Sequence, residues 1–130
     1  MTWNDASEDC KSRKGTLVNL TNSYENAVMR MMLPNHFWGM KFWVGLSNTN
    51  EEGTWLWEDN TEIVDFMNWK RHTKNRTNKC VYLDRGHSHL DWGADECDDE
   101  HNFICEYPDN IHWLRPELKN YENADLPIPN

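Results

Sequence analysis

The stretch that decides the fold is Phe42-Trp43-Val44-Gly45-Leu46, an apolar run of the length of a β-strand. Further short runs of the same kind precede or follow polar, turn-forming residues. They cover residues 53–57, 66–69, 80–83, 90–92 and 103–107. Successive side chains of a strand point to opposite faces, so each run can present one apolar face to a core. This part of the chain therefore predicts a set of short strands.

The residues nearest the start predict an amphipathic helix that begins directly after Thr2. The Thr2 hydroxyl can accept a hydrogen bond from the first turn. Helical spacing puts Trp3, Ala6 and Cys10 on one face. Basic residues crowd the last turn, and Gly15 is expected to end the helix.

A second helix is predicted between Ser23, which would cap it, and Pro34, which would end it. Its inward-facing residues are expected to be Tyr24, Ala27, Val28 and Met31. Two helices followed by several short strands indicate an α+β fold rather than alternating βαβ units.

Composition excludes several classes of protein. The 130 residues suit a single domain, and no apolar run approaches the roughly 18 residues that a membrane span needs, so direct membrane insertion is not expected. A net charge of -9 argues against general nucleic-acid binding. The sequence contains no nucleophile elbow, phosphate-binding glycine loop or zinc-hydrolase helix motif, so we expect that the protein is not an enzyme.

Cysteines and glycosylation motifs point to an oxidising, extracellular setting. The four cysteines include no C-x-x-C pair, which gives a structural zinc site little support, and they permit three disulfide pairings. Asn19 and Asn75 each begin an N-glycosylation sequon. We therefore expect a secreted protein or the ectodomain of a membrane protein.

Seven short motifs, taken in order, resemble the C-type lectin-like domain family. The sequence Trp43-Val44-Gly45-Leu46 is similar to the family's W-I-G-L core strand. The others are Trp3-Asn4-Asp5-Ala6 with Cys10 and Gly15-Thr16-Leu17-Val18, Trp55-x-Trp57-x-Asp59, Asn68-Trp69, Cys80-Val81, Trp92 with Cys97, and Phe103-Ile104-Cys105-Glu106. The resemblance spans residues 2–107 and implies the family's fold: two helices, short antiparallel sheets, a long loop region and two disulfides.

The resemblance also implies which cysteines pair and where the domain ends. It joins Cys10 to Cys105 and Cys80 to Cys97. The domain would occupy residues 1–107, and the Pro- and Asn-rich residues 108–130 would form a tail or linker with a short helical turn near Trp113. The family normally has a strand before its first helix, which pairs with the strand that holds Cys105. Because Met1 and Thr2 leave no room for a strand before the helix, we expect that this strand is missing and that the chain begins earlier in its parent protein.

The family's sugar-binding calcium site is expected to be lost. Calcium-dependent members hold the ion with a loop motif such as E-P-N or Q-P-D and with the W-N-D motif, because Ca²⁺ takes six to eight oxygen ligands. The corresponding loop, residues 70–79, has no acidic residue and five Lys or Arg residues. Gly93 and Ala94 stand where the Asn and Asp of W-N-D would be, and neither has a side-chain oxygen. The sequence therefore predicts neither this calcium ion nor another cofactor.

Three roles remain open for the basic loop. It can simply neutralise the acidic stretch of residues 91–100, or be solvated beside it. It can also bind an anionic ligand, such as a sulfated or carboxylated glycan or an acidic protein patch. The residues that would do so are Lys70, Arg71, His72, Lys74 and Arg76. A glycan on Asn75 would partly shield this surface.

Two metal-binding alternatives are weaker. Residual calcium binding would use Glu58, Asp59, Asp91 or Asp95. His87, His89 and Asp91 alternate and could share a strand face as zinc ligands, a pattern that a solvated strand also produces. The favoured function is a non-catalytic module that recognises a glycan without the sugar-site calcium. The alternative is a receptor domain for a protein ligand, since fold alone does not fix function.

Overall fold

The computed structural model describes residues 1–20, 31, 33, 37, 39–63, 69, 76–86, 90–107 and, for the backbone, 110–117. These residues contain one complete helix, α1 (Trp3–Ser12), followed by seven strands. The strands are β1 (Thr16–Leu17), β2 (Lys41–Ser47), β3 (Leu56–Trp57), β4 (Cys80–Arg85), β5 (Leu90–Asp95), β6 (Asn102–Tyr107) and β7 (Asn110–Glu117).

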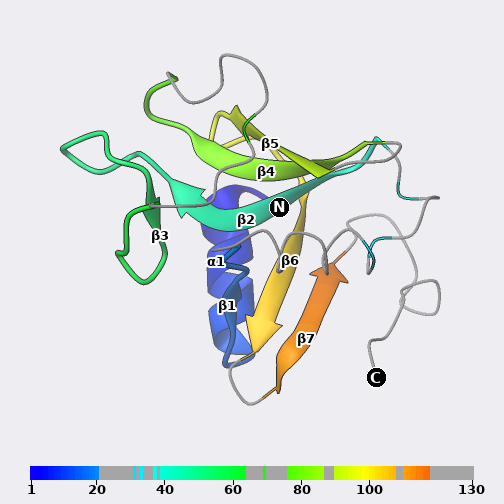
Figure 1. The fold of residues 1–130 in the computed structure, drawn as a ribbon. Coiled ribbons are helices and arrows are strands. Elements are labelled where there is room, and N and C mark those ends of the chain that lie inside the picture. The colour runs from blue at the N-terminus through cyan, green and yellow to red at the C-terminus, as the bar shows by residue number, and fades with distance from the viewer. Residues whose placement is uncertain are drawn as a thin grey trace.

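The seven strands form one sheet with the order β1-β6-β2-β4-β5 (Figure 1). Strand β3 pairs with β2, and β7 pairs with β6. The sequence predicts antiparallel pairing, and most pairs are antiparallel. The pairing of β2 with β6 is parallel, with Trp43 opposite Phe103. The α+β prediction is confirmed, with a mixed sheet at its centre.

Two apolar clusters lie on opposite faces of this sheet. One contains Val81, Leu83, Trp92 and Ala94 together with the buried Trp55 and Trp57. The other contains Cys80 and Tyr82, and α1 covers it through Ala6 and Cys10. The alternation of side chains along β4 and β5 produces this division. Trp55, Trp57 and Trp92 therefore belong to the core.

Helix α1 begins as the sequence predicts and ends differently. The backbone N–H of Asp5 donates to the Thr2 hydroxyl, which caps the first turn. At the other end Lys14, not Gly15, adopts the left-handed conformation, with φ of 67°. Gly15 is required for another reason: a Cβ there would lie 2.7 Å from the carbonyl oxygen of Glu106. Close approach to β6, not helix termination, selects this glycine.

The second predicted helix lies outside the described residues except at its end. Met31 is helical, but its side chain is 81% exposed, so the prediction that it faces inward is wrong. Leu33 and Phe37 are fully buried and fill this part of the core instead. The other residues predicted to face inward, Tyr24, Ala27 and Val28, lie outside the described part of the chain.

Both disulfides are present with the pairing that the family resemblance implies. Cys10 joins Cys105 across a sequence separation of 95 residues, and Cys80 joins Cys97 across 17 residues. The first ties α1 to β6, and the second ties the start of β4 to the turn after β5. No free cysteine remains.

Strand β7 corrects the description of the tail. Residues 110–117 pair antiparallel with β6, with Arg115 opposite Cys105, where the sequence predicts a linker and a helical turn near Trp113. The two strands run side by side in Figure 1. Proline and asparagine lower strand propensity, but an edge strand tolerates a residue such as Pro116. Strand β7 thus pairs with β6, the strand whose partner from the start of the chain was expected to be missing. A domain boundary at residue 107 stays a prediction.

Candidate functional site

The candidate site is the end of the β4–β5 hairpin at which the family resemblance places its calcium ligands. In this antiparallel pair Cys80 lies opposite Asp95, Val81 opposite Ala94, and Tyr82 opposite Gly93. The Cys80–Cys97 disulfide closes the same end. The site is therefore built on two paired strands and a crosslink, which fix its backbone.

The ring of Tyr82 leaves no room for a side chain at position 93. A Cβ on Gly93 would collide with Cζ and the hydroxyl oxygen of Tyr82 and would lie 2.8 Å from its Cε1. Tyr82 is itself buried and packs in the cluster beneath α1. An asparagine at position 93, as in the family's W-N-D motif, would have to displace this ring.

Arg76 occupies the neighbouring position with a positive charge. Its guanidinium Nη1 donates a hydrogen bond of 2.6 Å to the carbonyl oxygen of Ala94. The positive charge therefore lies at Ala94, the position that corresponds to the Asp of the W-N-D motif. A divalent cation at the same carbonyl would be repelled by the guanidinium.

Asn48 anchors the backbone on the β4 side of the basic loop. Its side chain is buried, with Oδ1 accepting from the N–H of Lys79 at 2.7 Å and Nδ2 donating to the carbonyl of Arg76 at 2.8 Å. Its own N–H also donates to the carbonyl of Lys79. The two ends of a short turn, residues 76 and 79, are thus fixed to the end of β2.

An ion pair links this end of the loop to the acidic stretch, between Lys79 Nζ and Glu96. A second pair reaches the acidic stretch from β2, where Lys41 Nζ lies 3.7 Å from Asp95. The Cys80–Cys97 disulfide brings Lys79 and Glu96 together, in agreement with partial neutralisation of the two stretches. Ion pairs that remain partly accessible to solvent contribute about 1 kcal/mol or less.

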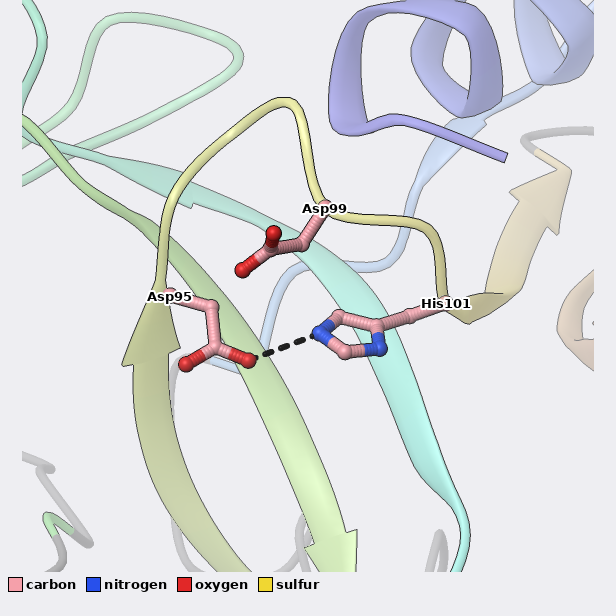
Figure 2. Close-up of side chains that lie close together, drawn as sticks. All are labelled: Asp95, Asp99 and His101. Atoms are coloured by element: carbon pink, nitrogen blue, oxygen red, sulfur yellow. Dashed lines mark hydrogen bonds and ion pairs between the residues drawn. The ribbon is translucent and has the colours of Figure 1, made fainter.

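A second constellation lies where the chain leaves β5 and turns toward β6. Asp95, Asp99 and His101 each bring one ligand atom within 4.8 Å of the others. Figure 2 shows the three side chains converging, with a 2.9 Å contact between His101 Nε2 and Asp95 Oδ2. No motif in the sequence signals this arrangement, because its members are separated by a turn and a disulfide-bonded cysteine.

The carboxylates proposed for residual calcium binding have structural partners. Glu58 lines a pocket of about 450 Å³ between α1 and β3, but its side chain is only 7% exposed. It accepts hydrogen bonds from the Ser7 hydroxyl and, at 3.0 Å, from the N–H of Leu17. Asp59 accepts from the N–H and hydroxyl of Thr61, and these hydrogen bonds lower the pKa of Asp59. Both carboxylates therefore accept hydrogen bonds from the protein itself.

Several predicted site residues fall outside the described part of the chain. They are Lys70, Arg71, His72, Lys74 and the sequon residue Asn75, together with His87 and His89. Of the predicted ligand-binding residues the structure therefore places Arg76 alone, at the end of the basic loop. Asn19, the other sequon residue, is half-buried beside Gly45, and its N–H donates to Glu106. Glycosylation at both positions stays a prediction.

Within the described part of the chain, no helix has the length and apolarity needed to cross a bilayer.

The family model, the similar sequences and the similar structures all point to the same family. The family model for the lectin C-type domain matches residues 1–107. A C-type lectin from Cerberus rynchops is 30% identical over 112 residues, which cover 82% of this chain and 70% of that protein. The carbohydrate-recognition domain of the mouse scavenger receptor C-type lectin superposes with a TM-score of 0.67, at 24% identity, covering 93% of this chain and 84% of that one.

A calcium-independent type II antifreeze protein also has this fold, with a TM-score of 0.64 and 23% identity, covering 78% of this chain and 74% of that one. The family consists of recognition domains and not enzymes, so the chain is a non-catalytic recognition module. Because the family model matches residues 1–107 and a C-type lectin is 30% identical over 112 residues, the chain belongs to the C-type lectin domain family.

Proposed function

We propose that this chain is an extracellular recognition module that binds anionic glycans through its basic loop, without calcium at the sugar site. The observation that carries the proposal is the hydrogen bond between the Arg76 guanidinium and the carbonyl of Ala94. Position 94 is one of the two positions that the family resemblance assigns to the calcium ligands. A guanidinium bonded at that position supports an anionic ligand rather than a metal-bridged neutral sugar.

The packing around Gly93 supports the same conclusion. Calcium binding would need side-chain oxygens at positions 93 and 94. Gly93 faces the Tyr82 ring, and Ala94 is buried with its side chain in the core. Restoring the ligands would therefore require repacking both faces of β5.

The charge of the loop supplies the attraction for the ligand. Residues 70–79 carry five Lys or Arg residues in a chain whose net charge is -9. Arg76 is hydrogen-bonded to Ala94, and Lys79 forms an ion pair with Glu96. We therefore infer that Lys70, Arg71 and Lys74 provide the contacts to sulfate or carboxylate groups. A glycan on Asn75 would narrow access to them.

A glycan array with neutral, sulfated and sialylated structures tests the proposal, run once with calcium and once with a chelator. We expect binding to anionic glycans that is unchanged by the chelator and weakened by added salt, because salt screens exposed charges. Calcium-dependent binding to neutral sugars would contradict it. A blank array under both conditions would favour a protein ligand instead.

Charge-matched variants separate specific contacts from net charge. The triple variant Lys70→Gln/Arg71→Gln/Lys74→Gln should lose anionic-glycan binding. Its control removes the same three charges from the end of α1, where the side chains of Lys11, Arg13 and Lys14 are exposed. Equal loss of binding in both variants would mean that overall charge, and not the loop, governs recognition.

A further inference from the structure

We propose that Asp95, Asp99 and His101 form a binding site for a divalent transition-metal ion such as Zn²⁺. The site lies at the end of β5 and the turn that follows it, and it does not depend on the proposed glycan binding. Its basis is the convergence of one imidazole nitrogen and two carboxylates, with ligand atoms within 4.8 Å of one another (Figure 2).

The spacing of the ligand atoms suits a metal ion after a small adjustment. Neighbouring ligands of tetrahedral zinc lie about 3.3 Å apart, because each stands about 2.0–2.1 Å from the ion. His101 Nε2 and Asp95 Oδ2 are already 2.9 Å apart. Asp99 is exposed in the turn, so its carboxylate can rotate toward the other two. Three protein ligands would leave a fourth position for water or an exogenous ligand.

The imidazole is held in place by groups that do not coordinate. Its ring centroid lies 4.5 Å from that of Trp43 and 5.4 Å from that of Tyr82, and its side chain is only 14% exposed. The N–H of His101 donates to the carbonyl of Met1 at 3.0 Å, and the terminal amino group of Met1 donates to the carbonyl of His101 at 3.1 Å. A ligand whose orientation is fixed in advance loses little conformational entropy when the metal binds.

The surrounding charge favours a cation. The stretch from residue 91 to residue 100 contains six carboxylates, and Lys41 is already drawn toward them, with Nζ 3.7 Å from Asp95. Lys41 is 39% exposed and can withdraw when a metal binds. One nitrogen and two carboxylates suit Zn²⁺ and neighbouring transition metals, whereas Ca²⁺ would want six to eight oxygen ligands.

Calorimetric titration of the intact 130-residue chain with ZnCl₂ tests this site, after treatment with a chelator and with both disulfides formed. We expect one zinc ion per chain and weaker or no binding of CaCl₂ and MgCl₂. The decisive variant is Asp99→Asn, which changes one exposed ligand. Its matched control is Asp98→Asn, which removes the same charge from the adjacent exposed residue outside the cluster.

The expected result is that Asp99→Asn weakens zinc binding by about tenfold or more, while Asp98→Asn changes it by less than about twofold. His101→Gln should also weaken binding, and the NMR signals of the His101 imidazole should shift with zinc in the wild type. Absence of zinc binding would overturn the proposal. Zinc binding that responds equally to Asp99→Asn and Asp98→Asn would also overturn it, because Asp99 would then act through its charge alone and not as a ligand.

Discussion

At the scale of single residues, the most constrained position of the site is Gly93, because the ring of Tyr82 fills the space where a side chain would stand. The sequence alone marks Gly93 as a missing calcium ligand but gives no reason for the glycine. The reason is a cross-strand contact between β4 and β5, which a linear motif does not contain.

We predict that Gly93→Ala lowers the free energy of unfolding by about 1–3 kcal/mol, since overpacking forces the ring or the backbone to shift. Chemical denaturation measures this change. In a Tyr82→Leu background the same substitution should cost less, by about 0.5 kcal/mol or more, because the colliding atoms are gone. Equal costs in both backgrounds would contradict the proposed contact.

Asp59 provides a prediction about pH. The hydrogen bonds from the side chain and backbone of Thr61 lower the pKa of Asp59, so they stabilise the fold while the carboxylate is ionised. This contribution is present above the unfolded-state pKa and disappears as the pH falls through the lower folded-state value. Thr61→Val should raise the pKa of Asp59 in an NMR titration, whereas Thr54→Val in the preceding turn should leave it unchanged.

At the scale of elements, the sequence predicts most strands and the start of α1, because local periodicity and capping determine them. The predicted run at 53–57 becomes the shorter strand β3 (Leu56–Trp57). Strand β7 could not be predicted, because residues 110–117 have little intrinsic strand propensity and form a strand through their pairing with β6. The Asp95, Asp99 and His101 cluster was missed for a similar reason, as a turn brings its members together.

The role of β7 can be tested by shortening the chain at two places. Deleting residues 108–130 removes β7 and leaves the backbone groups on that side of β6 unpaired, so we expect faster amide exchange in β6 and more aggregation. Deleting residues 118–130 keeps β7 and should change neither property. If the two deletions behave alike, β7 does not protect β6, and a domain boundary at residue 107 gains support.

At the scale of the whole molecule, the two disulfides close loops of very different size. In the entropic model the stabilisation grows with the logarithm of the loop length. Separations of 95 and 17 residues therefore differ by about 1.5 kcal/mol. We predict that Cys10→Ala/Cys105→Ala destabilises the domain by about this much more than Cys80→Ala/Cys97→Ala. Denaturant unfolding of the two variants measures the difference, and an equal or reversed order would rule out the loop-entropy explanation.

The Cys10–Cys105 bond also determines how the domain would respond to mechanical tension. If the chain were pulled from outside both cysteines, the force would pass from α1 to β6 through the sulfur atoms. The intervening segment, which could extend to roughly 320 Å for its separation of 95 residues, would carry no load. The residues of the proposed binding loop lie within that segment. Stretching of a tethered protein would thus strain the first turns of α1 and the pairing of β7, while the recognition surface stays unloaded.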